Sequence, residues 1–445
     1  MKTNTKSIFC VLLTILFLSP GVAKADELVR HNNDVNYGVE SIIRHYNSNI
    51  DIVCDRHLGS PSFTMYIEGV PTVTCLDVDM YDVLDFEIFK NRVYFCGKYN
   101  NGNGTIGRIG FFNLTGFSSA TNVQVYYFDV FWMKEVRALE IDIFSLLGTK
   151  EHLVVIGDGV EDEPIIVDFI NEGSYWEVNS SIIYNDSLRL SDLTFTKSYV
   201  VVTSTMEKSH NREGILWYFL KPTTDGVSIF QSGYSAYEYI GTNFSPKVIV
   251  KPIEKDIFVI AHTPWSPNET PDFYLTKCNG TSVIDRYILS EPNSVKHPKL
   301  RDIATKDTVR DVHLLINIEN NGTPCTIIYE ALIYITSNVF PVFGHSYNGV
   351  YATSLSKRRN RAHFVASGFG YSNGKPYVLK YEDGAYGCGC LPTIQNTMRR
   401  ISVDYTPEKI HFSRVLGEIV PVPYEKQTRV QNVSIDCYVQ AKDPE

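Results

Sequence analysis

An apolar motif returns along this chain about every 52 residues. Each copy is a short apolar strand that ends at a small or kinked position and is followed by a polar loop and a second apolar strand. One small sheet cannot bury both of its faces, so such copies have to stack against one another. The spacing therefore predicts an all-β fold, a seven-bladed β-propeller of four-stranded antiparallel blades. The seven copies occupy residues 50–54, 93–97, 153–157, 199–203, 257–261, 312–316 and 363–367.

Each unit is expected to contribute four short strands joined by turns rich in Gly, Asn, Asp and Pro, as antiparallel pairing requires. We expect the ring to be closed by N- and C-terminal strands, with residues from about 26 to 80 and from Arg399 onward sharing the closing blade. Closure would remove the exposed sheet edges. Because propellers serve binding proteins and enzymes alike, the architecture leaves the function open.

The first 25 residues have the pattern of a secretory signal peptide. Lys2 and Lys6 precede an apolar stretch over residues 8–18, and residues 23–25 read Ala-Lys-Ala. Residues 26–445 are then expected to form a single propeller domain. No later stretch approaches the roughly 20 apolar residues of a spanning helix. We therefore expect a secreted or periplasmic protein without a membrane span, and a monomer.

The charge balance argues against a nucleic-acid partner. The chain has 41 basic and 50 acidic residues, a net charge of −9, and removal of Lys2, Lys6 and Lys24 with the signal lowers it to −12. Nucleic-acid binding depends on Lys and Arg that neutralise phosphate. The nearest basic patch, residues 357–361, lies between two expected strands and is interpreted as a solvated turn. The chain also contains 28 Tyr and 24 Phe residues, and aromatic residues of this kind are enriched in β-strands.

Eight cysteines follow the signal, and their disulfide connectivity stays open because eight allow 105 pairings. Cys54 and Cys96 fall on apolar strands at nearly the same repeat position, where a buried free thiol is expected. Cys388 and Cys390 lie in a glycine-rich loop that Cys437 could reach. Their one-residue gap is shorter than zinc sites use, so we expect no metal there.

The usual catalytic and cofactor motifs are missing from the sequence. There is no P-loop, dinucleotide-binding glycine pattern, His-Glu-x-x-His or Gly-x-Ser-x-Gly, and we expect no cofactor. The acidic loop at residues 157–164 is interpreted as a solvated turn, because it lacks the alternating Asp order of a calcium loop. Calcium binding, or a carboxylate pair for glycoside hydrolysis, stays open for this loop.

Position in the repeat indicates a ligand surface more clearly than any motif does. If the seven apolar strands are equivalent, the loops that follow them emerge on one face, where a propeller normally binds its ligand. Aromatic rings stack on sugars and charged groups fix hydroxyls, so polar and aromatic residues there suit a glycan or protein ligand. Trp265, between Pro264 and Ser266-Pro267, is the strongest single candidate. The candidate ligand-binding residues are Arg56, His57, Tyr99, Asp158, His262 and Trp265.

Nine Asn-x-Ser/Thr sites occur, which in a eukaryotic secretory protein would indicate a glycosylated surface. The repeat at residues 85–97, followed by residues 106–113, resembles those of uncharacterised, secreted β-propeller proteins of gut and oral Bacteroidales. This resemblance implies an exported propeller. It brings no assigned activity, so no catalytic residue is implied by it.

Two functions follow from these observations. The first is an exported, non-enzymatic propeller that binds a glycan, peptide or surface partner through its loop face. The alternative is a polysaccharide- or glycoconjugate-acting enzyme, a glycoside hydrolase or lyase, that uses loop carboxylates or His. Titratable groups clustered around the central tunnel would favour the enzyme, whereas scattered charges on a broad polar and aromatic face would favour binding.

Overall fold

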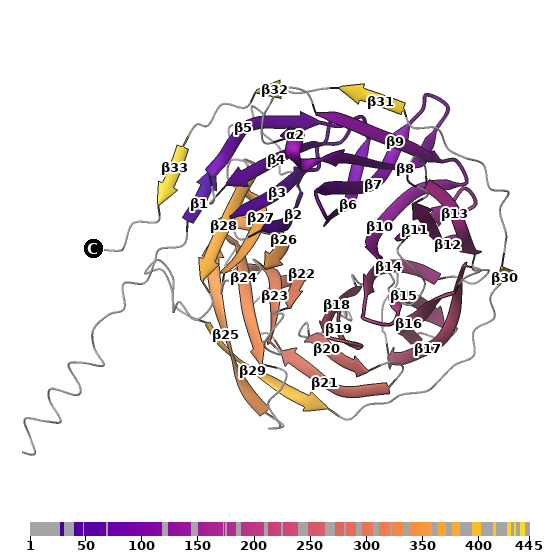
Figure 1. The fold of residues 1–445 in the computed structure, drawn as a ribbon. Helices are drawn as coiled ribbons and strands as arrows, with labels where there is room; N and C mark the ends of the chain where they lie inside the picture. Colours follow the sequence, from indigo (N-terminus) through magenta and orange to yellow (C-terminus); the bar gives the residue numbers. More distant parts are fainter. Residues whose placement is uncertain are drawn as a thin grey trace, which may run out of the picture.

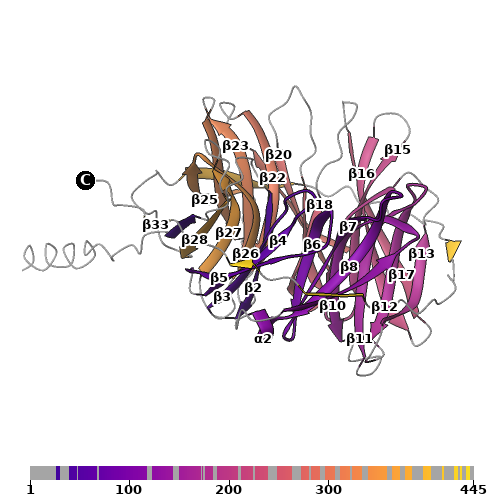
Figure 2. The same cartoon turned by 90° about the horizontal axis from the view of Figure 1, so that it is seen from above.

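Each of the seven apolar motifs forms the second strand of a run of antiparallel strands, and the runs are arranged in a ring around a central axis (Figure 1). The structure, a computed structural model, is thus an all-β propeller of antiparallel sheets. Seen after a 90° turn, the strands run between two faces of the ring (Figure 2). The described residues are 27–30, 40–47, 49–67, 70–117, 123–143, 150–171, 173, 176–183, 188–208, 212–223, 226–238, 248–262, 272–279, 282–290, 296–305, 311–320, 323–332, 339–357, 363–370, 376–382, 394–401, 413–414, 425–428, 431–432 and 437–440.

The first four runs follow the chain in order, each with its first strand nearest the axis. Their strands are β2 (Ser41–Asn47), β3 (Ile50–Asp55), β4 (Ser62–Ile67), β5 (Val70–Asp77), β6 (Asp82–Phe89), β7 (Arg92–Asn100), β8 (Thr105–Asn113), β9 (Gln124–Val130), β10 (Met133–Ile143), β11 (Glu151–Gly159), β12 (Pro164–Asn171), β13 (Trp176–Ile183), β14 (Leu188–Phe195), β15 (Val200–Lys208), β16 (Arg212–Thr223) and β17 (Gly226–Glu238). A short helix, α2 (Leu114–Phe117), follows β8.

The remaining runs continue around the ring to its start. Their strands are β18 (Val248–Glu254), β19 (Ile257–His262), β20 (Asp272–Asn279), β21 (Ser282–Ser290), β22 (Lys296–Thr305), β23 (Asp311–Asn320), β24 (Thr323–Leu332), β25 (Val339–Asn348), β26 (Val350–Lys357), β27 (His363–Gly370) and β28 (Pro376–Glu382). Strands β18–β21 and β22–β25 belong to one nine-stranded sheet, because β29 (Ile394–Ile401) pairs with both β21 and β25.

The apolar core lies between neighbouring sheets. Phe63 of β4, fully buried, packs its ring against three rings of the next sheet. Their centroids lie 5.3, 5.2 and 5.3 Å away, at Phe86, Phe95 and Phe112. Aromatic and β-branched side chains fill these interfaces, which explains the Tyr- and Phe-rich composition. Cys54 and Cys96 are buried within two of these clusters, and neither forms a disulfide with another described residue, as expected.

Both ends of the chain pair with strands of the ring. Strand β1 (Glu27–Arg30) pairs with β28 on one edge and with β33 (Cys437–Gln440) on the other. Strands β2–β5 (residues 41–77) form a separate sheet whose outer edge is β32 (Gln431–Asn432). Of residues 26–80, which the sequence predicts to share the closing blade with the C-terminal segment, only β1 among the described strands lies in the closing sheet. The predicted signal peptide lies outside the described residues.

The described strands of the C-terminal segment lie on the outside of the ring, and their order around it runs opposite to that of the blades (Figure 1). After β29, it adds a short strand to the outermost strands β13, β9, β5 and β1 in turn. We call these four strands the belt: β30 (Ser413–Arg414), β31 (Glu425–Thr428), β32 (Gln431–Asn432) and β33. The belt covers backbone groups that would otherwise form open sheet edges.

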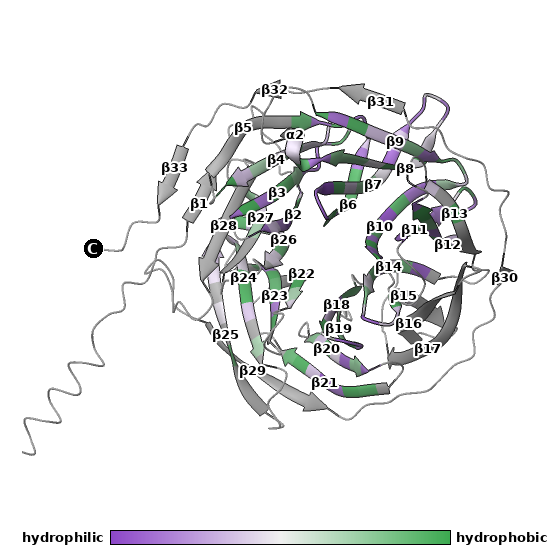
Figure 3. Cartoon of the chain, viewed as in Figure 1, coloured by the Kyte–Doolittle hydropathy of each residue, from purple (hydrophilic) through white to green (hydrophobic). Residues whose placement is uncertain are grey.

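Along the innermost strands β10 and β14, hydrophilic positions alternate with hydrophobic ones (Figure 3). This pattern is what a strand needs when one face packs on a neighbouring sheet and the other lines a polar space. No helix within the described ranges has the length and apolar character to cross a membrane.

Candidate functional site, a charged cavity on the propeller axis

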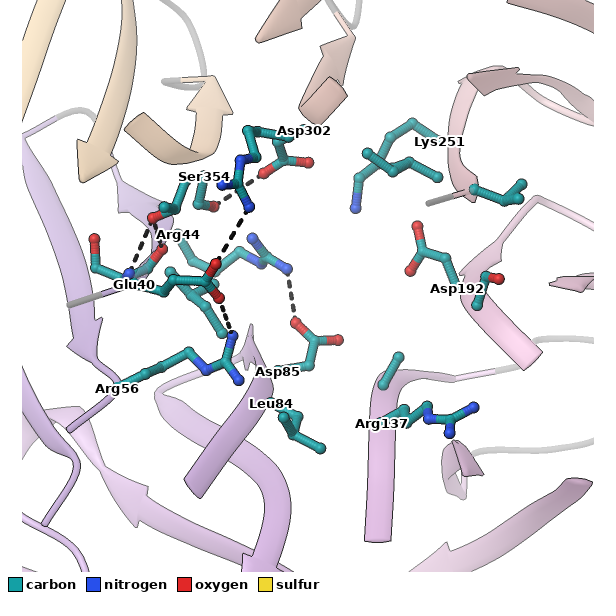
Figure 4. A pocket seen from close by; sticks show the side chains of 18 residues that line it. Glu40, Arg44, Arg56, Leu84, Asp85, Arg137, Asp192, Lys251, Asp302 and Ser354 are labelled. Carbon is teal, nitrogen blue, oxygen red and sulfur yellow. Dashed lines mark hydrogen bonds and ion pairs between the residues drawn. The ribbon is translucent and has the colours of Figure 1, made fainter. Parts of the chain in front are cut away.

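The innermost strands of the ring enclose a cavity of about 150 Å³. Its lining comes from β2, β6, β10, β14, β18, β22 and β26, from Glu40, which precedes β2, and from Arg56, which follows β3. Glu40 and Arg56 lie at the ends of β2 and β3 from which the β3–β4 loop emerges. The cavity therefore borders the face carrying the loops after the second strands, which we call the loop face. Its charged lining residues are Glu40, Arg44, Arg56, Asp85, Arg137, Asp192, Lys251, Arg301 and Asp302 (Figure 4).

A β-bulge recurs in the innermost strands at the height of the cavity. At this height, the pairing between the first and second strands shifts register in β6, β10, β14, β22 and β26, and β10 and β22 each have a further shift nearer their start. Such a bulge bends the strand and redirects a side chain. The residues inserted at the height of the cavity all line it and are Leu84, Arg137, Ser191, Arg301 and Thr353.

Three aspartates that line the cavity each come directly after an inserted residue, and their carboxylates connect neighbouring sheets by the same hydrogen bonds. We call them the axial aspartates: Asp85, Asp192 and Asp302. One oxygen of each accepts the backbone N–H of the next residue, from Phe86 at 2.9 Å, Leu193 at 3.0 Å and Ile303 at 2.8 Å. The other oxygen accepts a backbone N–H from the first strand of the next run, from Leu139 at 3.2 Å, Val250 at 3.0 Å and Leu355 at 2.8 Å. Both oxygens of each axial aspartate are therefore engaged in hydrogen bonds to the backbone.

The arginines near the loop face are held by carboxylates. Arg56 binds Asp82 at 2.8 Å and Glu40 at 2.9 Å, and Arg301 reaches the other oxygen of Glu40 at 3.2 Å. Burial acts against the charged form of Arg56, yet the bond to Asp82 raises its pKa. Glu40 thus joins Arg56 to Arg301 at the loop-face end of the cavity.

The two remaining cavity arginines are also paired. Arg44 binds Asp85 at 2.8 Å and Glu87 at 2.9 Å. Arg137 binds Glu135 at 2.6 Å and, more closely, Asp158. A guanidinium held by two carboxylates keeps its charge and its position, so these side chains form a fixed wall.

Lys251 differs from the four arginines. Its side chain extends from β18 toward the middle of the cavity (Figure 4), and within the described residues it has no side-chain hydrogen bond or ion pair. Burial opposes its charge, but Asp192 and, more weakly, Asp302 and Glu140 outweigh that effect and raise the pKa of Lys251. The cavity therefore contains an ammonium group that is charged and has donors to offer.

Carboxyl groups along the axis resist ionisation. Burial raises the pKa of Asp85 to about 6, against the effect of Arg44 and with a contribution from Glu87. Burial, followed by the charge of Glu87, also raises the pKa of Glu140 well above its ordinary value. The ionised state of these groups is disfavoured because water is excluded and like charges are close.

Three of the residues predicted for the ligand surface lie at or beside the cavity. Arg56 lines it. His57 follows in the β3–β4 loop, where burial lowers its pKa and no partner for its Nε2 lies within the described structure. Asp158, at the end of β11, binds the cavity residue Arg137. Burial raises the pKa of Asp158 against the effect of Arg137.

The other three do not line the cavity. Tyr99 in β7 lies under the Arg108 guanidinium, 3.1 Å from the ring centroid. His262, the buried last residue of β19, stacks on Tyr274 with ring centroids 5.2 Å apart, and burial lowers its pKa well below the ordinary value. Trp265 lies outside the described residues.

The acidic loop between β11 and β12 forms a tight turn that its own carboxylates complete. Glu163 accepts the backbone N–H of Glu161 at 2.8 Å, and Asp162 pairs with Lys134. Within the described residues, no cluster of three or more His, Cys, Asp or Glu side chains is arranged to hold a metal ion.

Sequence reasoning missed Lys251 and the axial aspartates. A signal for the aspartates exists: an Asp followed by a large apolar residue precedes every second copy of the apolar motif, at 85–86, 192–193 and 302–303. Lys251 lies opposite the third residue of its apolar motif, Val259, and Arg44 has the same position opposite Ile52 in the first run.

Comparisons with known proteins add little to this description. No family model matches the sequence, and no curated protein resembles it significantly. Among solved structures, the chain is similar to sucrose-6-phosphate hydrolase from Lactobacillus gasseri, with a TM-score of 0.35 and 8% sequence identity over 89% of this chain and 96% of that chain. A likeness this weak carries no argument about what the protein does.

Proposed function

We propose that this protein is an exported, monomeric binding protein that holds the anionic end of a glycan, peptide or surface partner in the axial cavity, with Lys251 as the anchor. The ligand would approach across the loop face, where Arg56, His57 and Asp158 lie near the cavity. A cavity of about 150 Å³ accommodates one small polar group of a longer ligand rather than the whole of it.

The observation that carries this proposal is the state of Lys251. The four cavity arginines are each paired with carboxylates, whereas Lys251 has no partner within hydrogen-bond distance among the described residues. A desolvated charge is costly unless hydrogen bonds satisfy it. An anionic or hydroxyl-rich group of a ligand would supply hydrogen-bond acceptors for Lys251. The raised pKa of Lys251 keeps its ammonium group charged for this contact.

The axial aspartates favour binding over hydrolysis. A glycosidase needs one carboxylic acid and one carboxylate that face the scissile bond. Asp192 and Asp302 instead accept backbone N–H groups with both oxygens. The enzymatic alternative rests on Asp85, whose pKa of about 6 suits a general acid, but Arg44 and two backbone groups already occupy its oxygens.

Arrays of glycans and peptides, probed with the mature full-length chain, test the proposal. Lys251→Gln should lose the binding seen with the natural sequence, while Lys255→Gln serves as the control because Lys255 is an exposed lysine of the adjacent β18–β19 turn. Equal array signals from all three proteins would refute the cavity as the site. Turnover of chromogenic glycosides that Asp85→Asn abolishes would favour the enzyme instead.

We infer that the ring counts seven blades. The seven apolar motifs supply seven second strands, and the nine-stranded sheet contains two four-stranded runs, β18–β21 and β22–β25, joined through β29. An experimental electron-density or cryo-EM map decides the number directly, and six or eight repeats of the inner strand around the axis would overturn it.

A further inference from the structure

Four exposed apolar side chains lie on the loop face of the first three sheets. Leu58 in the β3–β4 loop is 69% exposed, Phe131 before β10 is 61% exposed and Val160 after β11 is 60% exposed. Tyr81, just before β6, is 39% exposed. These connections all lie at the same end of their antiparallel strands as Arg56. We call the four side chains the apolar collar.

The collar is tied to the cavity mouth by short backbone contacts. The Gly59 N–H donates to the Tyr81 carbonyl at 2.6 Å, which brings the Leu58 loop beside Tyr81. Tyr81 directly precedes Asp82, whose carboxylate holds the cavity residue Arg56.

The other half of the collar is built in a similar way. The Val160 N–H donates to the Trp132 carbonyl at 3.3 Å, next to Phe131. Val160 also lies two residues after Asp158, which binds the cavity residue Arg137. Both halves of the collar therefore belong to loops whose neighbouring residues hold the cavity wall.

The composition of the collar favours a polypeptide over a polysaccharide. Sugars stack on flat aromatic faces, which Tyr81 and Phe131 provide, but the other two collar residues, Leu58 and Val160, are aliphatic. Large apolar side chains exposed together on one face are typical of protein–protein contacts, where aliphatic and aromatic residues form the centre and charges the rim. The neighbouring cavity contributes a complementary charge for an acidic side chain, the Lys251 ammonium group.

We propose that the partner of the loop face is a polypeptide segment that packs apolar side chains on the collar and places an Asp or Glu carboxylate at Lys251. This inference rests on the proposed binding function and narrows its ligand class. The apolar contacts on the collar would supply most of the affinity. The carboxylate bound to Lys251 would determine which residues of the segment lie on the collar.

A random peptide library displayed on phage and panned on the full-length protein tests this inference. We expect enriched sequences that combine apolar residues with an Asp or Glu. Synthetic copies of them should bind Phe131→Ser, Leu58→Ser and Lys251→Gln at least about tenfold more weakly than the natural sequence. Ile284→Ser is the control, because Ile284 is 39% exposed but follows the β20–β21 turn on the opposite face.

The outcomes separate the two proposals. If Lys251→Gln weakens binding and the collar variants do not, or if only glycans bind in a Lys251-dependent way, the polypeptide inference is wrong and the cavity remains the site. If Lys251→Gln binds every probe as the natural sequence does, the proposed function itself fails. Unchanged melting temperatures establish that each variant is folded.

Discussion

The carboxylate of Asp302 accepts the backbone N–H of Leu355 at 2.8 Å, across the boundary between two neighbouring inner strands. The same oxygen accepts the Ser354 hydroxyl at 2.9 Å, and the second oxygen accepts the N–H of Ile303 at 2.8 Å. Asp85 and Asp192 repeat the backbone part of this arrangement at two other boundaries. The ring is thus held near its axis by carboxylates as well as by the apolar interfaces further out.

Asp302→Ala should lower the free energy of unfolding by about 2–3 kcal/mol, since three hydrogen bonds are lost and two buried backbone N–H groups are left without an acceptor. Urea denaturation followed by tryptophan fluorescence measures the change. Glu161→Ala, at an exposed loop position, is the control and should be neutral. A loss below about 0.5 kcal/mol would mean that the axial aspartates do not stabilise the ring.

The repeat in the sequence predicted the strands well because each second strand has a mainly apolar centre and is bounded by turn residues. The site was harder to predict, because the cavity is made by first strands whose bulges redirect Arg137, Ser191 and Arg301 toward the axis. A bulge leaves no clear trace in a single sequence. Loop position alone placed Tyr99 and His262 on the ligand surface, but both rings are held by neighbours within the blades, Arg108 and Tyr274.

The buried Asp55 carboxyl group should make the free energy of unfolding depend on pH. It is buried, neither of its oxygens has a partner in the described structure, and burial raises its pKa to about 7. In the unfolded chain the carboxyl loses its proton near pH 4. The favourable contribution of the protonated group is therefore complete below about pH 4 and is lost as the pH rises through 7, to a total of at most about 4 kcal/mol.

Asp55→Asn should remove this dependence, because the amide does not ionise. Urea midpoints of both proteins between pH 4 and pH 8 measure it, and the variant should gain stability relative to the natural sequence as the pH rises. Parallel profiles for the two proteins would show that Asp55 is ionised in the fold and solvated after all. The Glu161→Ala profile should parallel that of the natural sequence and serves as the reference.

Truncation before Arg399 should destabilise the whole ring. It removes part of β29 and all of the belt, so the outer edges of β5, β9 and β13 lose their partners, and β1 loses β33. Open edges invite pairing between molecules, so we expect a lower melting temperature and aggregation that increases with concentration. A chain ending after Gln440 keeps the belt and is the control. If both chains melt at the same temperature, the belt is an appendage.

The variant Trp265→Ala tests the predicted ligand-binding residue that lies outside the described residues. A Trp held between prolines would offer a large, rigid contact area, so its loss should weaken ligand binding about tenfold while the melting temperature hardly changes. A lower melting temperature with intact binding would instead place Trp265 in the packing between blades.

The most direct measurement is the affinity of Lys251 variants for the strongest binder found on the arrays, determined by isothermal titration calorimetry. Lys251→Gln should bind at least about tenfold more weakly, and Lys251→Arg should retain most of the affinity because it keeps the positive charge. Both variants should melt at the temperature of the natural sequence, since Lys251 has no side-chain hydrogen bond or ion pair in the described structure. Equal affinities for the natural sequence and Lys251→Gln would contradict the assignment of the axial cavity as the binding site.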